Sequence, residues 1–178
     1  MVEIRLKRTG ENACCTFGEL RIPKIKFGCR TLELKDGSNM KCKQSCRLPE
    51  GNYIIDMKIN QWGFFVPVIK YRVRGFAVKP KFDLLTHHFS NLLNGDIAVG
   101  TEYKSQYEIT NDDNFRQAFS DACRVAYMEN HQDQFVLRVY KQVRDYQMYG
   151  DDFFKELVNQ SWDFLDNVDD EEDKDAGQ

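Results

Sequence analysis

Residues 1–8 read M-V-E-I-R-L-K-R, and this stretch sets the fold class. Val2, Ile4 and Leu6 alternate with charged residues, a period of two that is typical of a strand with one buried face. The stretch lacks the apolar h-region of a secretory signal, so we expect it to belong to the folded domain and not to direct secretion. The same period continues to about residue 100 and predicts a β-rich domain.

Apolar runs separated by turn signals predict seven short strands in this region. The runs C-C-T-F-G-E-L-R-I and K-F-G-C-R-T-L-E-L flank a turn at I-P-K, residues 22–24. A second turn signal, L-P-E-G, occupies residues 48–51. Pro67 indicates the start of a strand or an edge position, because proline cannot donate a ladder hydrogen bond. Strands of this length and spacing favour a small, mainly antiparallel sandwich or open barrel.

The period changes after Asp112 and predicts a helix over residues 112–129. Its apolar stripe comprises Phe115, Ala118, Phe119, Ala122, Val125 and Ala126. Thr110 and Asp113 have the spacing of a capping box at the start of this helix. The run Q-F-V-L-R-V-Y-K that follows, residues 134–141, predicts a closing strand. The chain should therefore fold as α+β, with one helix packed on the strands of a domain covering residues 1–141.

Residues 142–167 predict an added C-terminal helix, followed by a disordered acidic tail over 168–178. One face of the added helix is strongly apolar and comprises Phe153, Phe154, Leu157, Val158, Trp162 and Leu165. This face has two interpretations, a cover for the sheet or a contact surface for another subunit. The second implies a protein partner or self-association through the helix.

Composition bounds the class of protein. At 178 residues and 42% hydrophobic content, the chain is long enough for one domain with a core. No stretch is long and apolar enough to span a membrane. Residues 166–178 hold seven acids and one lysine, so the net charge of −3 divides into −6 here and +3 over residues 1–165. A mildly basic body is thus joined to an acidic end.

Six cysteines suggest neither a disulfide framework nor a metal site. No secretion signal accompanies them, so we expect reduced thiols. Cys42 and Cys46 could form half of a zinc site, but no second pair of matching spacing follows. We therefore expect neither a metal nor another cofactor.

Several short motifs follow one another in a set order. They are T-F-G-E-L-R-I from residue 16, C-R-T-L-E-L from 29, L-P-E-G-N-Y from 48, R-G-F from 74 and G-D-I-A-V-G from 95. Over about residues 2–141 the chain resembles a family of uncharacterised phage and bacterial domains with the pattern T-L-G-E-L, Y-T-L-E, I-P-A-G-x-Y, I-H-x-G-N and G-C-I-L-V-G. That family is distantly similar to L,D-transpeptidase domains, which act on the cell wall. In those domains a cysteine thiolate attacks a peptide carbonyl while a histidine takes its proton.

The resemblance assigns candidate catalytic residues to the stretch L-T-H-H-F-S-N-L-L-N-G-D-I-A-V-G, residues 85–100. His87 or His88 would be the base, with Asn91 beside it, and Asp96 stands where the cysteine would be. Adjacent strand residues point to opposite faces, so at most one histidine can face Asp96. A metal at this pair would need further ligands from Asp83 or His131, and no zinc-binding spacing supports one.

Loss of the cysteine leaves two functions from different classes. The first is a non-catalytic, phage-type structural or binding protein, with a degenerate active site and with the virion as one setting. In that setting the chain would be made in the cytoplasm of the host cell before assembly. The second is a hydrolase of peptidoglycan peptides that uses the histidine and Asp96 as an acid–base pair.

A third function rests on a basic stripe. It comprises Lys70, Arg72, Arg74, Lys79 and Lys81. On one strand the first three would share a face and could hold the phosphates of nucleic acid or another anionic polymer. This predicts a small anion- or nucleic-acid-binding accessory protein. No fingerprint of a nucleic-acid-binding fold is present, so a solvated strand face touched by the acidic tail is the favoured interpretation.

Overall fold

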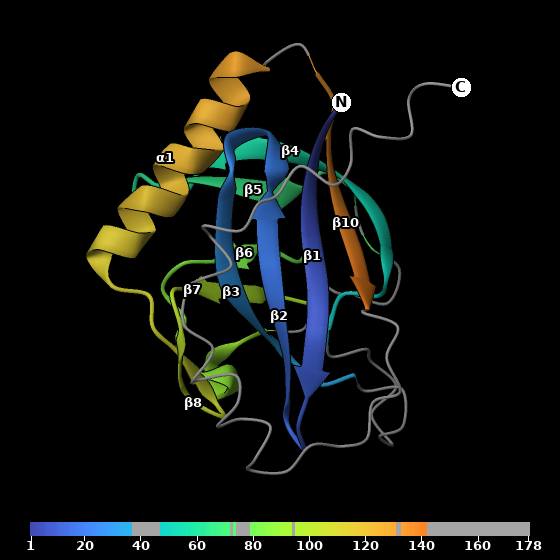
Figure 1. Ribbon diagram of the computed structural model, residues 1–178, viewed down its shortest axis with the longest axis vertical. Coiled ribbons are helices and arrows are strands. Elements are labelled where there is room, and N and C mark those ends of the chain that lie inside the picture. Colours follow the sequence, from blue (N-terminus) through green and yellow to red (C-terminus); the bar gives the residue numbers. More distant parts are fainter. Residues whose placement is uncertain (37–46, 72, 74–78, 94, 131–132, 142–178) are drawn as a thin grey trace.

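The computed structural model describes residues 1–36, 47–71, 73, 79–93, 95–130 and 133–141 (Figure 1). The helix predicted over 142–167 and the tail over 168–178 lie outside these residues. The described elements are β1 Val2–Glu11, β2 Cys15–Ile22, the 3-10 turn η1 Pro23–Ile25, β3 Phe27–Leu34, β4 Gly51–Ile59, β5 Phe65–Ile69, β6 Phe82–Asp83, the 3-10 turn η3 Phe89–Asn91, β7 Ile97–Gly100, β8 Tyr103–Ser105, β9 Glu108–Ile109, α1 Asp113–Glu129 and β10 Phe135–Lys141.

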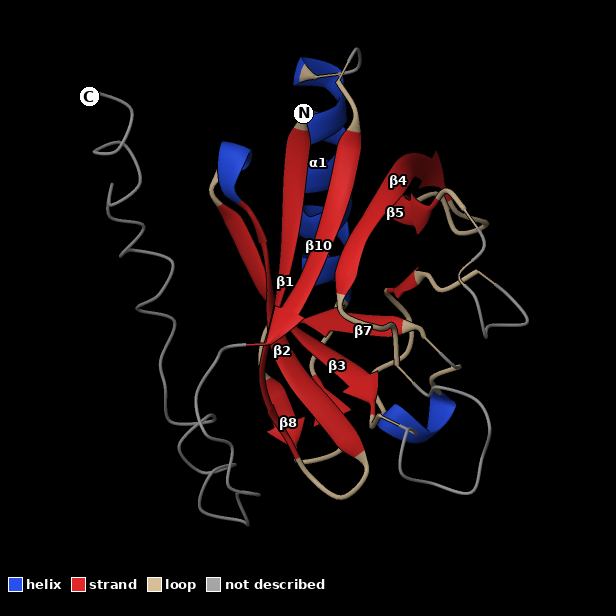
Figure 2. Ribbon diagram, turned by 90° about the vertical axis from the view of Figure 1, so that its right-hand side faces the viewer, coloured by secondary structure: helices blue, strands red, loops and turns tan. Residues whose placement is uncertain are grey.

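Eight of the strands form one sheet, in the order β5-β4-β10-β1-β2-β3-β7-β6. The pairs β1–β10 and β6–β7 are parallel and the others are antiparallel. A single bridge between Val68 and Lys81 joins the two ends of the sheet, so the sheet is nearly closed into a barrel (Figure 2). The prediction of a mainly antiparallel, β-rich α+β fold is confirmed. Pro67 lies in β5, an edge strand, as expected.

The alternating sequence of β1 builds the core. Val2, Ile4 and Leu6 point into the barrel and are buried, with Phe135, Leu137 and Val139 of β10 directly beside them in register. Burying an apolar side chain of this size contributes roughly 1.5–3 kcal/mol. The central pair of strands is therefore held chiefly by its inward side chains, and its outward side chains are free to be charged.

Helix α1 covers the open side of the barrel beside β5 (Figure 1). Its N-cap is Asp112, whose carboxylate accepts a hydrogen bond from the Phe115 N–H at 2.8 Å. The predicted capping box of Thr110 and Asp113 is therefore wrong. The buried face comprises Phe115, Phe119, Ser120, Cys123 and Ala126. No helix within the described residues has the length and apolar character needed to cross a membrane.

A second apolar cluster lies on the outer face of the sheet, under β8, β9 and η3. It comprises Cys15, Phe17, Leu32, Leu92, Ala98, Tyr103 and Ile109. The buried hydroxyl of Tyr103 accepts a hydrogen bond from Gly18 N at 3.0 Å, within bonding distance also of the Gly18 and Thr31 carbonyls. This cover spans one end of β2 and β3 only.

Gly100, the last residue of the G-D-I-A-V-G motif, is expected to be indispensable for the fold. A Cβ there would overlap the backbone carbonyl of Thr110 and lie 2.7 Å from Cγ1 of Ile109. Since the Thr110 segment is itself bonded to Thr101, it cannot move away cheaply. Gly100→Ala should lower the free energy of unfolding by about 3 kcal/mol or more, measured by urea denaturation.

Gly63→Ala is the matched control. Gly63 has a positive φ of 86°, but nothing lies near its missing Cβ. That variant should lose only about 1 kcal/mol, the penalty of a left-handed alanine. Equal losses for both variants would show that overlap at Thr110 is not what Gly100 avoids.

Candidate functional site

The loop that carries His87 and His88, called the histidine loop below, is bonded to the β8–β9 hairpin through its backbone. Ile109 N donates to His87 O at 2.7 Å, and Phe89 N donates to Tyr107 O at 3.0 Å. The His88 ring caps η3, with Nδ1 2.7 Å from the Ser90 hydroxyl and accepting from Ser90 N at 3.3 Å. His87 is exposed. The loop thus uses one histidine as a structural cap and leaves the other in solvent.

Asp96 is 2% exposed and holds the seam of the barrel. Its Oδ1 accepts a hydrogen bond from Lys81 N at 3.1 Å, and the next residue, Ile97, donates its N–H to Lys81 O at 3.0 Å. Lys81 is the residue that bridges to Val68 and closes the sheet. The second carboxylate oxygen, Oδ2, is buried without a hydrogen bond. Burial raises the pKa of Asp96 to about 6, although the bond from Lys81 opposes this shift.

The predicted catalytic residues are not joined to one another. Among the described hydrogen bonds and ion pairs, none connects His87 or His88 with Asp96. Asn91 is exposed, and its N–H donates to His88 O within η3. Within the described part of the chain, no cluster of three His, Cys, Asp or Glu side chains could hold a metal.

Three of the described cysteines belong to the core and offer no thiolate. Cys15, Cys29 and Cys123 are buried. Burial raises the pKa of Cys15 to about 12, and it raises the pKa values of the other two as well. These thiols stay protonated at neutral pH and serve as apolar core.

Asp83 is the last residue of β6 and stabilises the turn that leads from β6 into the histidine loop. Its Oδ1 accepts from Leu85 N and Thr86 N, both at 2.9 Å. Burial alone would raise the pKa of Asp83, but these bonds lower it below its usual value. Asp83 and Asp96 therefore lie near the same lysine, Lys81, with their pKa values shifted in opposite directions.

The basic stripe does not form one strand face. β5 ends at Ile69, so Lys70 lies in a bend after the strand. Lys79 Nζ donates to Lys70 O at 2.7 Å, and Lys81 forms an ion pair with Asp83 at 3.7 Å. Arg72 and Arg74 lie outside the described residues. So do the proposed interface residues Phe153, Phe154, Leu157, Val158, Trp162 and Leu165.

A polar site that sequence reasoning missed lies at the mouth of the barrel. Arg8 and Glu33 are 1% and 0% exposed and form a bidentate ion pair, with Nε to Oε2 at 2.9 Å and Nη2 to Oε1 at 2.7 Å. Arg8 Nη2 also donates to the Leu48 carbonyl. Burial alone would lower the pKa of Arg8, but the charge of Glu33 raises it, so the guanidinium stays charged. The pair joins β1, β3 and the segment entering β4.

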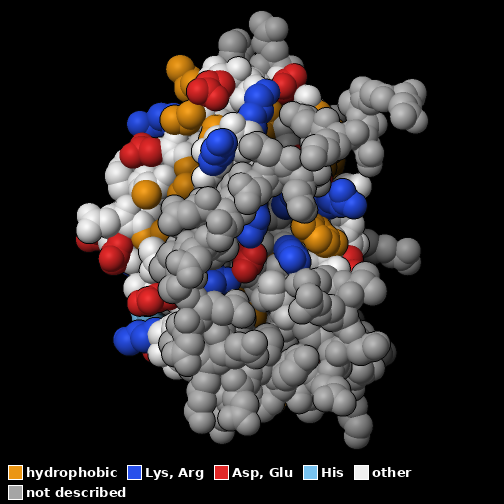
Figure 3. Space-filling model, viewed as in Figure 1, with side chains coloured by type: hydrophobic (Ala, Val, Ile, Leu, Met, Phe, Trp, Pro, Cys, Tyr) orange, Lys and Arg blue, Asp and Glu red, His pale blue; other side chains and the backbone are white. Residues whose placement is uncertain are grey.

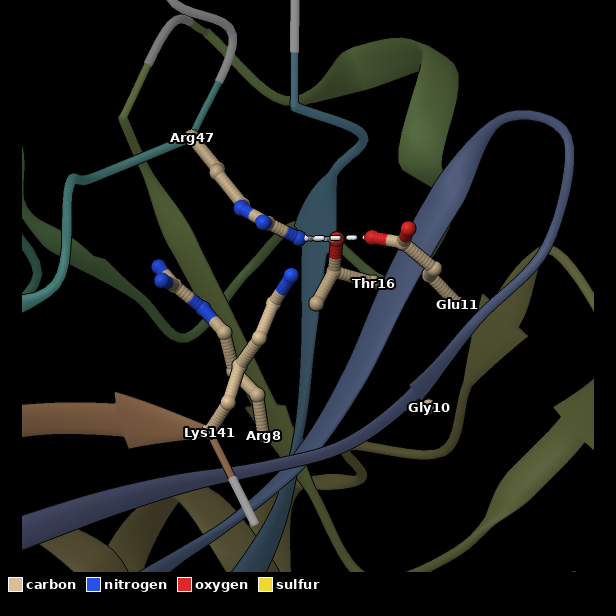
Figure 4. A pocket seen from close by; sticks show the side chains of 6 residues that line it. All are labelled: Arg8, Gly10, Glu11, Thr16, Arg47 and Lys141. Atoms are coloured by element: carbon tan, nitrogen blue, oxygen red, sulfur yellow. Dashed lines mark hydrogen bonds and ion pairs between the residues drawn. The ribbon is translucent and has the colours of Figure 1, made fainter. Parts of the chain in front are cut away.

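Arg47 crosses the same mouth above Arg8 (Figure 4). Its Nη1 donates to Glu11 and to the Thr16 hydroxyl, each at 2.8 Å, and its Nη2 donates to Asp36 at 3.1 Å. Arg47 is only 4% exposed on its side chain. Lys141, at the end of β10, lines the pocket from the side of Arg8 (Figure 4). The mouth therefore gathers several charges of both signs.

A cavity of about 250 Å³ adjoins this cluster. Its lining comprises Arg8, Asp36, Arg47, Pro49 and Glu50. Concave sites with a few convergent polar groups are where small ligands usually bind. The lining offers guanidinium donors and carboxylate acceptors together, which suits a ligand that carries both charges.

One signal in the sequence points to this site. Arg8 continues the inward register of Val2, Ile4 and Leu6, since it follows Leu6 by two residues. A charged residue at an inward position must be paired or lie at the rim of the barrel. Its partner Glu33 could not be identified, because pairing across β2 depends on the strand register.

Comparison with protein-family models, with curated proteins and with solved structures finds no match for this chain.

Asp96 should make stability depend on pH. Its pKa is near 3.8 unfolded and about 6 folded, so the folded state binds the extra proton. The stabilisation is complete below pH 4 and is lost as the pH rises through 6. Asp96→Asn keeps an acceptor for Lys81 N without the charge. The free energy of unfolding of this variant, relative to wild type, should rise by up to about 3 kcal/mol between pH 4 and 7.

Urea denaturation at a series of pH values measures this difference. Asp113→Asn is the control, because Asp113 is exposed and pairs with Arg116 at the surface. A relative stability of Asp96→Asn that does not change with pH would show that the Asp96 pKa is not raised.

The Arg8–Glu33 pair should show strong coupling. Arg8→Met leaves Glu33 buried without its guanidinium and should cost about 3–5 kcal/mol. The double variant Arg8→Met plus Glu33→Met removes both charges and should lose less than Arg8→Met alone. A double-mutant cycle by urea denaturation measures the coupling. Lys104→Met, at the exposed Lys104–Glu108 pair, should change stability by less than about 1 kcal/mol. Additive losses at Arg8 and Glu33 would contradict the coupling.

Proposed function

We propose that this chain is a non-catalytic structural or binding protein of phage type, in which residues 85–100 are retained as architecture. One observation carries the proposal. Asp96, the residue in the position of the nucleophile, is buried and uses its carboxylate to hold Lys81 at the barrel seam. His88 likewise uses its ring to cap η3. Asp96 and His88 are therefore engaged in the fold, while His87 lies exposed in the loop.

The phage setting is supported by the resemblance of the ordered motifs, from T-F-G-E-L-R-I to G-D-I-A-V-G. The same resemblance points to peptidoglycan as the material that an ancestral domain acted on. A protein that has lost the nucleophile can still bind such a substrate. We therefore place the ligand contact at the barrel mouth and not at the histidine loop.

The chemistry of the mouth suits a peptide that carries both charges. Arg47 already bonds Glu11 and Asp36, so a ligand carboxylate would take the place of Asp36 at Nη2, while Lys141 lines the neighbouring pocket. Guanidinium groups bind carboxylates well because their N–H groups match its two oxygens. Glu50 and Asp36 can receive an amine. Peptides of the cell wall carry free carboxylates and amines, so they fit this mixed lining better than a purely anionic polymer does.

One experiment tests binding and catalysis together. Purified peptidoglycan is incubated with the full-length protein and pelleted, and the pellet is assayed for bound protein and the supernatant for released muropeptides. We expect binding without release. Arg47→Met should reduce bound protein by about tenfold, as the loss of a charge-assisted hydrogen bond predicts. Arg124→Met, which removes an exposed positive charge on α1, is the matched control.

Two outcomes would overturn the proposal. Release by wild type that disappears in a folded His87→Ala plus His88→Ala variant would identify a cysteine-free hydrolase. Absence of binding, or binding that Arg47→Met and Arg124→Met weaken equally, would remove the mouth as the contact.

A further inference from the structure

Three arginines stand in a line on the outer face of the sheet. Arg5 of β1 lies directly opposite Arg21 of β2 on one side and Arg138 of β10 on the other. Neighbouring strands are about 4.8 Å apart, so the three side chains leave the sheet close together. Like charges at directly opposed positions destabilise a sheet. The main core, with Val2, Ile4 and Leu6, lies on the opposite face of these strands.

Two glutamates of this surface, Glu3 and Glu19, each form ion pairs with two arginines. Glu3 bonds Arg5 at 2.8 Å and lies 3.7 Å from Arg138. Glu19 bonds Arg30 at 2.6 Å and lies 3.5 Å from Arg21. We define the basic face as these six residues together with Lys7. Five cations against two glutamates leave an excess of three positive charges among the described residues.

The basic face begins where the apolar cover ends. The second cluster reaches Phe17 and Leu32, and the outward residues beyond them are Glu19 and Arg30. Figure 3 shows the Lys and Arg side chains over the middle of the face formed by β1 and β2, with acidic groups among them. Since the outward residues here are charged, a partner would be recognised by charge and not by apolar contact.

We propose that the basic face binds an acidic peptide segment, and that the occupant is residues 166–178 of the same chain. Charge complementarity supports this occupant, because the segment carries seven acids and one lysine, a net −6. Covalent linkage supports it as well. β10 lies within the basic face and ends at Lys141, and 24 residues, 142–165, precede the segment.

The tether is long enough for this contact. A chain of that length can span up to roughly 80 Å when extended. The ten-residue strand β1 is only about 33 Å long. Tethering also gives the segment an effective concentration in the millimolar range, which favours it over an untethered competitor. The contact would shield the arginine line and keep other anions away from it.

Zero-length carbodiimide cross-linking of the full-length protein tests the proposal, with peptide mapping by mass spectrometry. We expect the amine of Lys7 to form amides with carboxylates of residues 166–178. The yield should fall at least about fivefold between 0.01 M and 1 M salt, because the Debye length falls from roughly 30 to 3 Å. The triple variant Arg5→Gln, Arg21→Gln and Arg138→Gln should show a similar fall at low salt.

A second triple variant is the matched control. Lys24→Gln, Lys104→Gln and Arg124→Gln remove three exposed positive charges that are not part of the basic face, and the cross-link yield should not change. Mixing isotope-labelled with unlabelled protein shows whether each cross-link lies within one chain. The salt dependence is measured on the wild-type protein, so it tests the contact even if the first triple variant fails to fold.

Each of the following results would overturn the proposal. No cross-link from Lys7 to the segment, or a yield that ignores salt, would overturn the contact. Cross-links of mixed isotope mass would assign the face to a second copy. An oligothymidylate probe tests nucleic acid as the occupant. Equal, tight binding by wild type and by a variant with all seven acids amidated would overturn occupancy by the chain's own segment.

Discussion

The buried ion pair between Arg8 and Glu33 is the constraint on which the mouth of the barrel depends. Arg8 on β1 faces Gly18 across the β1–β2 ladder, and its guanidinium reaches past β2 to Glu33 on β3. The bond to Leu48 O then fixes the segment entering β4. A buried charge is costly to leave without a partner, so these three segments have to assemble together.

A second buried carboxylate lies nearby with a different role. Asp96 immediately precedes Ile97, the register partner of Glu33, but no described ion pair neutralises it. The hydrogen bond from Lys81 N to its carboxylate lies where the two ends of the sheet meet. A buried carboxylate thus stabilises one part of the barrel through an ion pair, at Glu33, and another through a hydrogen bond from the backbone, at Asp96. Burial raises the pKa of Asp96, and the hydrogen bond from Lys81 only partly opposes this shift.

The candidate functions use different surfaces of one sheet. The inner face is apolar along most of its length and becomes charged at Arg8, where the mouth and its cavity lie. The outer face is apolar under Tyr103 and charged beyond Glu19. Ligand binding at the mouth and contact with an acidic segment on the outer face are therefore compatible, and each can be removed by substitution without touching the other.

Periodicity determined much of the fold, because Val2, Ile4 and Leu6 in β1 and Phe115 and Phe119 in α1 report directly which face is buried. The sequence also placed the histidines and Asp96 in one stretch. Only the tertiary structure decided what those residues do, since His88 bonds within η3 and Asp96 bonds to Lys81, fifteen residues earlier. The partner of Arg8, the line of three arginines and the closure of the barrel depend on strand register. Register is set by packing among distant segments, and no local pattern records it.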